Sequence, residues 1–213
     1  MKQAEKSKIT HDKIINAAVK EFGTKNYDSA SLNNICIDNN ISKGLIYHNF
    51  KSKDDVYLCC VKLCFSKITV FLSEIKYDDH DFRISLENLL DKRYEFFKEN
   101  PYFSNIFFGT VLNPPLHLID KIKEIRVEFD TFNIKLYKKI ISSVQLRNGI
   151  SENEALEYFL VLQEMFNGYF EKKAFQYTDF HTLIEDHETK LSKILDLMLY
   201  GIAKENCDDS RDN

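Results

Sequence analysis

The stretch from Ile41 to Lys53 constrains the fold most, because it predicts a very short helix followed at once by the start of another. Ser42 can cap the first helix, since a serine hydroxyl at that position accepts a hydrogen bond from an otherwise unpaired backbone N–H. Ser52 can cap the second helix, and Asp55 three residues later completes a capping-box pattern.

The side chains between these caps divide into two kinds. Ile41, Ile46 and Phe50 fall near one helical face, which we expect to be buried. A cation, a glycine and two polar-tipped aromatics fall on the other face, and such a surface suits close approach to a phosphate backbone. These residues are Lys43, Gly44, Tyr47 and His48.

This stretch resembles the recognition helix of the TetR family of bacterial transcriptional regulators, whose signature runs Ser-Lys-Gly-x-(aliphatic)-Tyr-x-x-Phe-x-(Ser/Thr)-Lys. The resemblance extends upstream at the right spacing and covers roughly the first quarter of the chain. Residues 10–27 predict a first helix, and residues 31–39 predict a second. Their inward-facing residues are expected to be Ile14, Ala18 and Phe22 in the first helix and Leu32, Ile35 and Cys36 in the second.

Two positions depart from the family pattern. The family has glycine after the first helix and again in the turn before the recognition helix, whereas this chain has Asn26 and Asn40. Asparagine is among the non-glycine residues that best tolerate a positive φ, so both turns can still be built.

The resemblance implies an all-α protein of about nine helices. Residues 1–55 are expected to form a three-helix helix-turn-helix DNA-binding domain, and residues 56–205 a helical ligand-binding and dimerisation domain. We expect residues 206–213 to be a disordered tail. The helix start and stop signals in the sequence support an all-α fold, and no segment shows the alternating apolar and polar residues of a strand. The later helices are predicted over residues 53–76, 82–99, 102–112, 116–148, 151–177 and 180–204.

Composition and charge exclude several classes of protein. No apolar stretch reaches the length of a membrane-spanning helix and the N-terminus is polar, so we expect a soluble cytoplasmic protein with no membrane partner. The five cysteines are an odd number, which indicates reduced thiols. The net charge is −4, but residues 1–60 hold nine lysines against seven acidic residues. The slight basic excess therefore lies in the expected DNA-binding part.

No pattern indicates an enzyme, a cofactor or a metal. The six glycines are not clustered into a phosphate-binding loop. His181 and His187 are six residues apart, which does not place two ligands on one helical face. Cys60 and Cys64 do have a four-residue spacing, so a thiol sensor or metal site competes with plain packing of small apolar side chains. Packing is favoured, because no partner ligand lies nearby in the sequence.

Aromatic residues crowd the segments 82–112 and 116–177. They predict either a bulky core or an aromatic-lined cavity in the place where the family carries its effector pocket. Arg93 and Arg126 lie among them, and a solvated helix face is the favoured interpretation for both. The resemblance implies an unknown small-molecule effector, for which the candidate ligand-binding residues are Tyr94, Phe97, Phe103, Phe107, Phe108, Phe129, Gln163, Phe166 and Asn167.

Double-stranded DNA and a second copy of the chain are the expected partners. The helices predicted over residues 151–177 and 180–204 carry many apolar residues, and the second is apolar around much of its circumference. Both are therefore expected to form a homodimer interface. Their apolar residues are Leu156, Phe159, Leu160, Leu191, Ile194, Leu195, Met198 and Ile202. The resemblance gives the candidate DNA-binding residues as Thr10, Ser31, Ser42, Lys43, Gly44, Leu45, Tyr47, His48 and Lys53.

The sequence therefore leaves two functions open. The first is a ligand-responsive transcriptional regulator, a repressor that binds a palindromic operator as a dimer and releases it when a small molecule binds. The second is a DNA-binding architectural or protein-interaction factor of the same fold with no effector. In the first case the helix that starts at Lys53 would act as a rigid rod between the two domains, since neither glycine nor proline interrupts it before Lys76.

Overall fold

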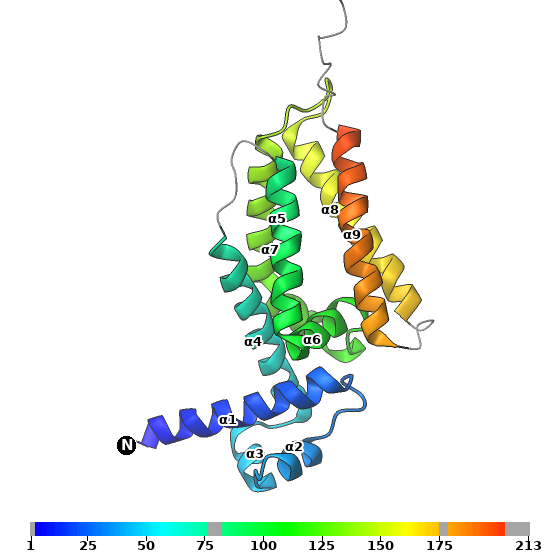
Figure 1. The fold of residues 1–213 in the computed structure, drawn as a ribbon. Coiled ribbons are helices and arrows are strands. Elements are labelled where there is room, and N and C mark those ends of the chain that lie inside the picture. The colour runs from blue at the N-terminus through cyan, green and yellow to red at the C-terminus, as the bar shows by residue number, and fades with distance from the viewer. Residues whose placement is uncertain (1–2, 76–81, 175–178, 203–213) are drawn as a thin grey trace, which may run out of the picture. The chain divides into compact units, whose positions relative to one another are not determined.

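The computed structural model describes residues 3–75, 82–174 and 179–202, which form helices joined by loops (Figure 1). The prediction of an all-α fold with about nine helices is confirmed. The described elements are α1 (Gln3–Thr24), α2 (Leu32–Asp38), α3 (Lys43–Asn49), α4 (Lys53–Ser73), α5 (Phe82–Glu99), α6 (Pro101–Leu112), the 3-10 turn η1 (Leu116–Leu118), α7 (Ile119–Ser142), α8 (Glu152–Lys173) and α9 (Phe180–Ile202).

The predicted boundaries are wrong at α1 and at α7. The first helix was expected over residues 10–27, but α1 spans Gln3–Thr24. A single helix was expected over residues 116–148, with its stop at Asn148-Gly149, but α7 ends at Ser142. The Ser142 and Ser143 hydroxyls donate to the carbonyls of Lys139 and Ile140, at 2.8 and 2.7 Å, and so satisfy the last turn of the helix. Gly149, with φ 88°, belongs to the loop that leads into α8.

The chain divides into two compact units. The first contains residues 1–74 and 93–131, and the second contains residues 75–92 and 132–213. The first unit therefore holds α1 and the short helices α2 and α3, together with α4 and α6. The functional boundary expected at residue 55 stays a prediction.

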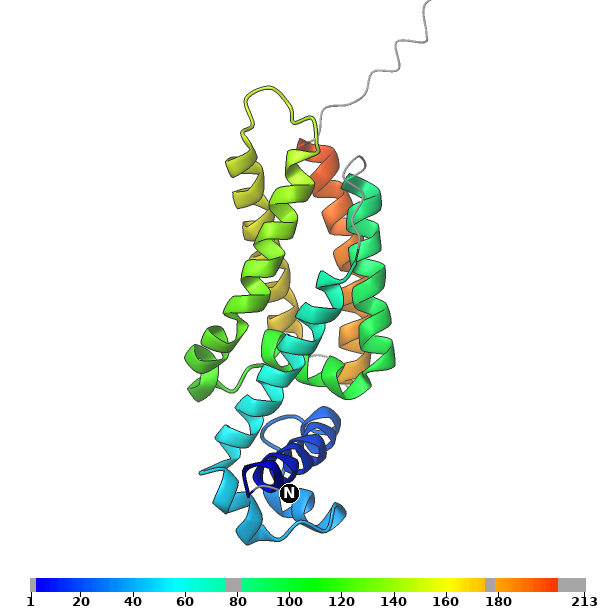
Figure 2. The ribbon, with the colours of Figure 1, turned by 90° about the vertical axis from the view of Figure 1, so that its left-hand side faces the viewer.

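Three helices form the core of the first unit, where α1, α4 and α6 pack against one another (Figure 2). Helix α1 buries Ile14, Ala18 and Phe22, as its periodicity predicts. Gly23 allows α6 to approach closely, because a methyl group there would lie 2.5 Å from Tyr102 Cβ. Helix α2 contacts both α1 and α3, so the short helices are carried on this core.

The expectation that no apolar stretch is long enough to cross a membrane is wrong for α4. Its 21 residues pass that test by length and composition. The packing of α4 against α1 and α6 accounts for this composition, since core helices pass the same test. Its buried residues are Val56, Tyr57, Cys60, Val61, Cys64, Phe65, Ile68 and Leu72.

Helices α8 and α9 lie side by side in the second unit (Figure 1). The capping box predicted at the start of α8 is confirmed, because Ser151 Oγ accepts from the Glu154 N–H while Glu154 Oε2 accepts from the Ser151 N–H. Asp179 caps α9 as expected, accepting from the N–H groups of His181 and Thr182 at 3.2 and 3.1 Å. The expected end of α8 at Tyr177 and the tail 206–213 lie outside the described residues.

Candidate nucleic-acid interface

Serine caps begin each of the helices α2, α3 and α4. The hydroxyl oxygens of Ser31, Ser42 and Ser52 each accept a backbone N–H at 3.2 Å. The capping box expected at Ser52 does not form, because Asp55 Oδ2 accepts from the N–H of Lys51, at 3.0 Å. The carboxylate therefore reaches one residue further back and holds the chain as it leaves α3.

The two asparagines that stand in place of glycine behave differently. Asn40 has φ 51°, so the turn between α2 and α3 uses the left-handed conformation that was expected of it. Asn26 does not adopt a positive φ. Its Oδ1 instead accepts from the N–H of Ser29, at 2.9 Å. The turn after α1 is thus closed by a side chain rather than by a positive φ.

Glu21 is a buried carboxylate that the sequence interpretation missed. It accepts from the Ser31 N–H at 2.9 Å, from Asn34 Nδ2 at 3.0 Å and from Lys25 Nζ at 2.9 Å. Burial raises its pKa, but the bonds from Lys25, Ser31 and Asn34 outweigh this and lower the pKa below its usual value. Its position three residues after Ala18, on the inward face of α1, was the available signal.

Helix α3 has one buried face and one exposed face, as predicted. Ile41, Ile46 and Phe50 are buried. The opposite face is exposed, and nothing lies within 4 Å of a methyl group placed at Gly44. Tyr47 is 52% exposed, so its ring does not belong to the core. The exposed residues of this face are Ser42, Lys43, Gly44, Leu45, Tyr47 and His48.

The other predicted DNA contacts flank α3 in the chain. Lys53, the first residue of α4, is half-buried, with its Nζ 4.4 Å from the centre of the Tyr27 ring. Ser31 and Thr10 are also half-buried, Ser31 as the cap of α2 and Thr10 within α1. The structure therefore presents an exposed group on α3 and a half-buried group around it.

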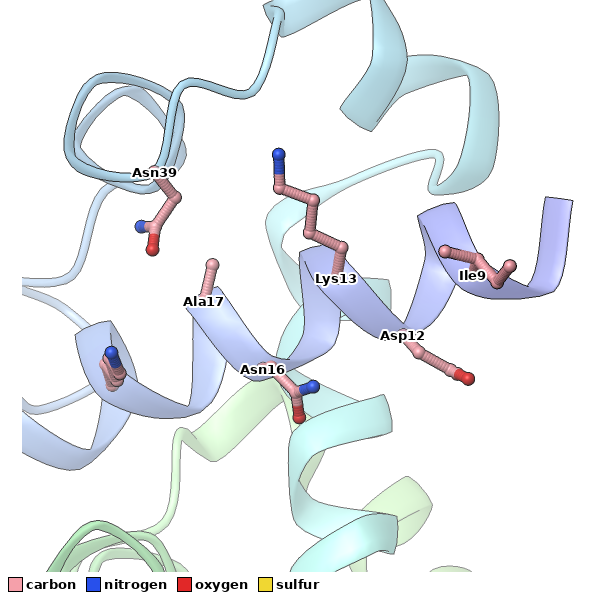
Figure 3. A pocket seen from close by; sticks show the side chains of 7 residues that line it. Ile9, Asp12, Lys13, Asn16, Ala17 and Asn39 are labelled. Atoms are coloured by element: carbon pink, nitrogen blue, oxygen red, sulfur yellow. The ribbon is translucent and has the colours of Figure 1, made fainter. Parts of the chain in front are cut away.

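A hollow of about 450 Å³ lies beside α1 and was not expected from the sequence. Figure 3 shows the Lys13 side chain extending away from the α1 backbone on the side where Asn39, at the end of α2, is found. The hollow borders the turn that leads into α3. It is lined by Ile9, Asp12, Lys13, Asn16, Ala17, Lys20 and Asn39.

The aromatic residues of the first unit form a packed group, here called the aromatic cluster. Neighbouring rings have centroids 4.9 to 5.6 Å apart, the separation of rings in direct contact. Phe103 is buried nearby, whereas Tyr94 is 54% exposed. This favours the interpretation of a bulky core over a cavity at these rings. The cluster consists of Phe65, Phe96, Phe97, Phe107, Phe108 and Phe129.

The solvated helix face expected for Arg93 is wrong. Arg93 is only 8% exposed, and its guanidinium carbon lies 5.8 Å from the ring centre of Phe107. Arg126 lies 5.6 Å from the ring centre of Phe65 and pairs with Asp130 at 3.2 Å. Both guanidinium groups therefore pack on aromatic faces of the cluster, where cation–π attraction offsets part of the cost of burial.

The three remaining ligand candidates lie on α8 in the second unit. Phe166 is buried and Gln163 is half-buried. Asn167 Oδ1 lies 3.0 Å from His187 Nε2, and His187 Nδ1 lies 2.9 Å from Glu188 Oε1. The polar side chain of Asn167 is thus already engaged by a buried histidine of α9. Neither compact unit by itself brings all nine candidate ligand residues together.

The paired cysteines of α4 are packing residues. Cys60 and Cys64 are fully buried, and burial raises the pKa of both thiols. The Cys64 thiol donates to the carbonyl of Phe103, at 3.4 Å. Among the described residues no group of three or more histidine, cysteine, aspartate or glutamate side chains could hold a metal ion.

The apolar faces of α8 and α9 differ from the predicted ones. Leu156, Phe159, Leu191 and Leu195 are buried, so much of the predicted dimer face lies in the core of the second unit. A second stripe on α8 is exposed, at helical spacing, and α9 exposes Leu197. The exposed residues of this α8 stripe are Tyr158, Val161, Met165 and Tyr169, between 47% and 68% exposed.

Comparison with known proteins gives matches to both the sequence and the fold. Residues 14–59 match the model of the family described as bacterial regulatory proteins, tetR family. The biofilm operon icaADBC HTH-type negative transcriptional regulator IcaR of Staphylococcus epidermidis is 32% identical over 85 residues, 40% of this chain and 44% of that protein. IcaR of Staphylococcus aureus strain Newman is 28% identical over 137 residues, 60% of this chain and 74% of that protein. The chain thus spans less than half of the first of these curated relatives.

Solved structures show the same fold at lower identity. A TetR family transcriptional regulator from Chloroflexus aurantiacus superposes with a TM-score of 0.59 at 20% identity, covering 93% of this chain and 95% of that one. FadR from Bacillus subtilis in complex with stearoyl-CoA gives 0.58 at 18% identity, covering 89% and 98%. The matched helix-turn-helix segment at residues 14–59, the IcaR relatives and the shared fold all support a regulator of the TetR family.

Proposed function

We propose that this protein is a cytoplasmic ligand-responsive transcriptional regulator that represses transcription by binding a palindromic operator as a homodimer. The exposed face of α3 carries the proposal, because it offers a cation, a glycine and two polar-tipped aromatics on a helix whose only buried residue is Ile46. Repression is supported by the IcaR relatives, which are named as negative transcriptional regulators.

Lys43, Tyr47, His48 and Lys53 contact phosphates in this proposal, and Gly44 lets the α3 backbone approach the DNA. The open space around Gly44 supports that role. The hydroxyls of Thr10, Ser31 and Ser42 add further phosphate contacts. Leu45 is 38% exposed and cannot hydrogen-bond a base, so it packs on a thymine methyl group and gives modest sequence preference.

Dimerisation is supported by the exposed stripe of α8. Four large side chains at helical spacing make a contiguous apolar surface, which a second copy of α8 and α9 would cover. Two copies of α3 would then meet successive major grooves roughly 34–36 Å apart, and this geometry calls for a palindromic operator.

The effector part of the proposal rests on α4 and the aromatic cluster. Helix α4 begins four residues after α3 ends, and further along it Phe65 and Phe71 lie 5.1 and 5.3 Å from the rings of Phe107 and Phe96. A small molecule that displaced these rings would move α4 and, with it, the DNA-binding helices. The stearoyl-CoA complex of FadR supports a ligand in this fold. Roles for Tyr94, Gln163, Phe166 and Asn167 in binding it remain predictions.

DNA binding is tested by selecting a duplex from a random library and measuring its affinity by fluorescence anisotropy over a range of salt concentrations. Lys43→Ala should weaken binding to all sequences and reduce the slope of log K against log salt by about 0.9 for each phosphate that the protein no longer neutralises. Lys98→Ala, which removes an exposed lysine at the end of α5, is the matched control. Equal slopes for the two variants would exclude Lys43 from the interface.

Dimerisation is tested by light scattering, where we expect a mass of about twice the 25.1 kDa of one chain. Met165→Asp places a charge in the α8 stripe and should shift the mass towards the monomer. Leu116→Asp is the control, because Leu116 is 83% exposed in the first unit. A monomeric wild-type protein at micromolar concentration would refute the dimer.

A DNA-binding protein without an effector is the second candidate, and the ring packing of the aromatic cluster favours it. Rings already in contact leave a ligand nothing to fill unless they move. A thermal-shift screen discriminates the two functions, since a ligand must stabilise the state that it binds. Any hit is then titrated into the protein–DNA complex. A ligand that binds yet leaves DNA affinity unchanged would rule out the effector switch.

A further inference from the structure

The orientation of Lys53 is set by an aromatic ring rather than by a carboxylate. Its Nζ lies 4.4 Å from the centre of the Tyr27 ring and 3.4 Å from the Asp28 carbonyl oxygen, to which it donates. Lys53 is followed in the chain by Asp54 and Asp55, either of which could attract a flexible ammonium group. Both carboxylates are engaged elsewhere, since Asp55 accepts from the Lys51 N–H and Asp54 accepts from the Tyr27 hydroxyl.

Tyr27 is held firmly in its place. Its ring packs edge-on against Tyr57 with centroids 4.9 Å apart and lies parallel to Phe22 at 6.4 Å. Its hydroxyl donates a hydrogen bond to Asp54 Oδ1. Burial raises the pKa of Tyr27, and the neighbouring carboxylate of Asp54 raises it further. Donation to a carboxylate also enriches the ring in electron density, which strengthens its attraction for a cation.

His117 joins this arrangement from a distant part of the chain. Its Nε2 lies 3.4 Å from both Asp54 Oδ1 and the Tyr27 hydroxyl oxygen, and its ring centre is 5.5 Å from that of Tyr27. The hydrogen bond from Tyr27 lowers the pKa of Asp54 against the effect of burial, and His117 adds to the lowering. His117 belongs to η1, which leads directly into α7 and its cluster residue Phe129.

We propose that Asp54 and His117 are positioning residues that, through Tyr27, hold Lys53 ready for a DNA phosphate and tie this contact to the segment before α7. The inference rests on the proposed DNA-binding function. Asp54 accepts the Tyr27 hydrogen bond and so orients the ring beneath the Lys53 ammonium group. His117 contacts the same oxygen, Asp54 Oδ1. If this arrangement is broken, the Asp54 carboxylate becomes a partner for the adjacent Lys53 and withdraws its charge from the DNA.

The other charged groups near these residues do not replace this arrangement. Asp28 acts on Tyr27 from the turn after α1, and Lys121 acts on Asp54 from the first turn of α7. Asp28 meets Lys53 through its backbone carbonyl, and Lys121 is itself a cation that cannot hold an ammonium group. Displacement of η1 by a change in α7 would therefore reach Lys53 through His117.

The test measures affinity for the selected duplex in a double-mutant design. Tyr27→Phe keeps the ring but removes the bond to Asp54, and His117→Gln removes the imidazole. Each should weaken binding about threefold to tenfold, the effect of one missing hydrogen bond. In a Lys53→Ala background both should have no further effect. Tyr102→Phe and His181→Gln, at exposed positions, are the matched controls. Equal losses in both backgrounds would show general destabilisation and overturn the proposal.

A second readout needs no DNA. The Lys53 Nζ lies over the Tyr27 ring, so we expect the ring current to shift the NMR signal of the adjacent ε-methylene upfield in the free protein. Tyr27→Phe and His117→Gln should both reduce this shift, while the controls leave it unchanged. A wild-type protein that binds no duplex but shows these changes would refute DNA binding and leave the positioning intact. Unchanged shifts in both variants would overturn the positioning, whatever the DNA result.

Discussion

Helices α3 and α6 belong to the same compact unit but are held in opposite ways. Half of the twelve residues of α6 are buried, among them Phe107 and Phe108, so packing fixes this helix along its length. Helix α3 buries only Ile46 and is fixed at its ends, by the Ser42 cap and by the Phe50 N–H that donates to the Ile46 carbonyl. End fixation leaves the side of α3 free, which a helix that meets DNA requires.

Because α6 is held by packing and α3 by its ends, the two helices should respond differently to substitutions. Packing interactions are numerous and cooperative, so a change in α6 spreads through its neighbours. Caps and hydrogen bonds act at single atoms, so a change near α3 removes a defined interaction. The expected effects therefore run from large and global in the aromatic cluster to small and local beside α3.

Truncation of the cluster is expected to have the largest effect. Phe108 is fully buried against Phe97 and Phe107, so Phe108→Ala should lower the free energy of unfolding by about 3–5 kcal/mol. Urea denaturation measures this change. Leu116→Ala, at a position 83% exposed, should change it by less than about 0.5 kcal/mol. If Phe108→Ala cost as little as the control, the cluster would be an open cavity rather than a core.

A buried charge beside the short helices comes next. Glu21→Gln replaces a carboxylate that accepts hydrogen bonds from three residues and should cost about 1.5–3 kcal/mol at neutral pH, measured by urea denaturation. The folded pKa of Glu21 is lowered, so its contribution is present above the ordinary value of 4.5 and is lost as the pH falls through the folded pKa.

The variant should therefore differ from wild type less in acid than at neutral pH. Asp12→Asn, which changes an exposed carboxylate on the same helix, is the control and should leave the pH profile unaltered. A Glu21→Gln protein that loses the same stability in strong acid as at neutral pH would show that shape, not charge, matters at this position.

Local contacts such as helix caps can be predicted from the sequence, whereas contacts between distant residues cannot. The caps at Ser42 and Ser52 lie within three residues of the N–H groups that they accept, so spacing along the chain is enough to find them. Glu21 bonds to Ser31 and Asn34, and His117 meets Tyr27 across 90 residues, so both need the folded chain. Periodicity cannot assign either contact.

Sequence periodicity also fails to predict which face of a long helix is buried. Apolar residues surround much of α8, and the sequence alone did not show which stripe the core would take. The buried stripe includes Leu156 and Phe159, while Met165 and Tyr169 are left exposed. Arg93 was misjudged for a related reason, since an arginine can be buried when its guanidinium packs on aromatic rings. Packing partners, not residue type, decide these cases.

Two glycines provide a matched comparison of the regions at smaller effect. A methyl group at Gly23 would lie 2.5 Å from Tyr102 Cβ, so Gly23→Ala should force α1 and α6 apart and cost about 1–3 kcal/mol of unfolding free energy. Gly44→Ala meets nothing within 4 Å and should stabilise α3 by up to about 1 kcal/mol. Thermal unfolding measures both changes.

Gly44→Ala should have opposite effects on stability and on DNA affinity. Gly44→Ala is expected to weaken binding to the selected duplex despite its higher stability, because the methyl group keeps the α3 backbone away from the phosphates. A stabilised Gly44→Ala protein with wild-type affinity would remove Gly44 from the interface while leaving the fold unchallenged.

The smallest expected effect concerns the turn that aims α3. Asn40 has φ 51°, a conformation that asparagine tolerates and glycine adopts without strain, so Asn40→Gly should change the free energy of unfolding by no more than a few tenths of a kcal/mol. Asn26→Gly should instead lose about 0.5–1 kcal/mol, since Asn26 lacks a positive φ and its side chain accepts from the Ser29 N–H. Urea denaturation of the two variants side by side measures the difference. Equal losses would mean that both turns depend on the asparagine side chain rather than on backbone conformation, and α3 would then be aimed by hydrogen bonding alone.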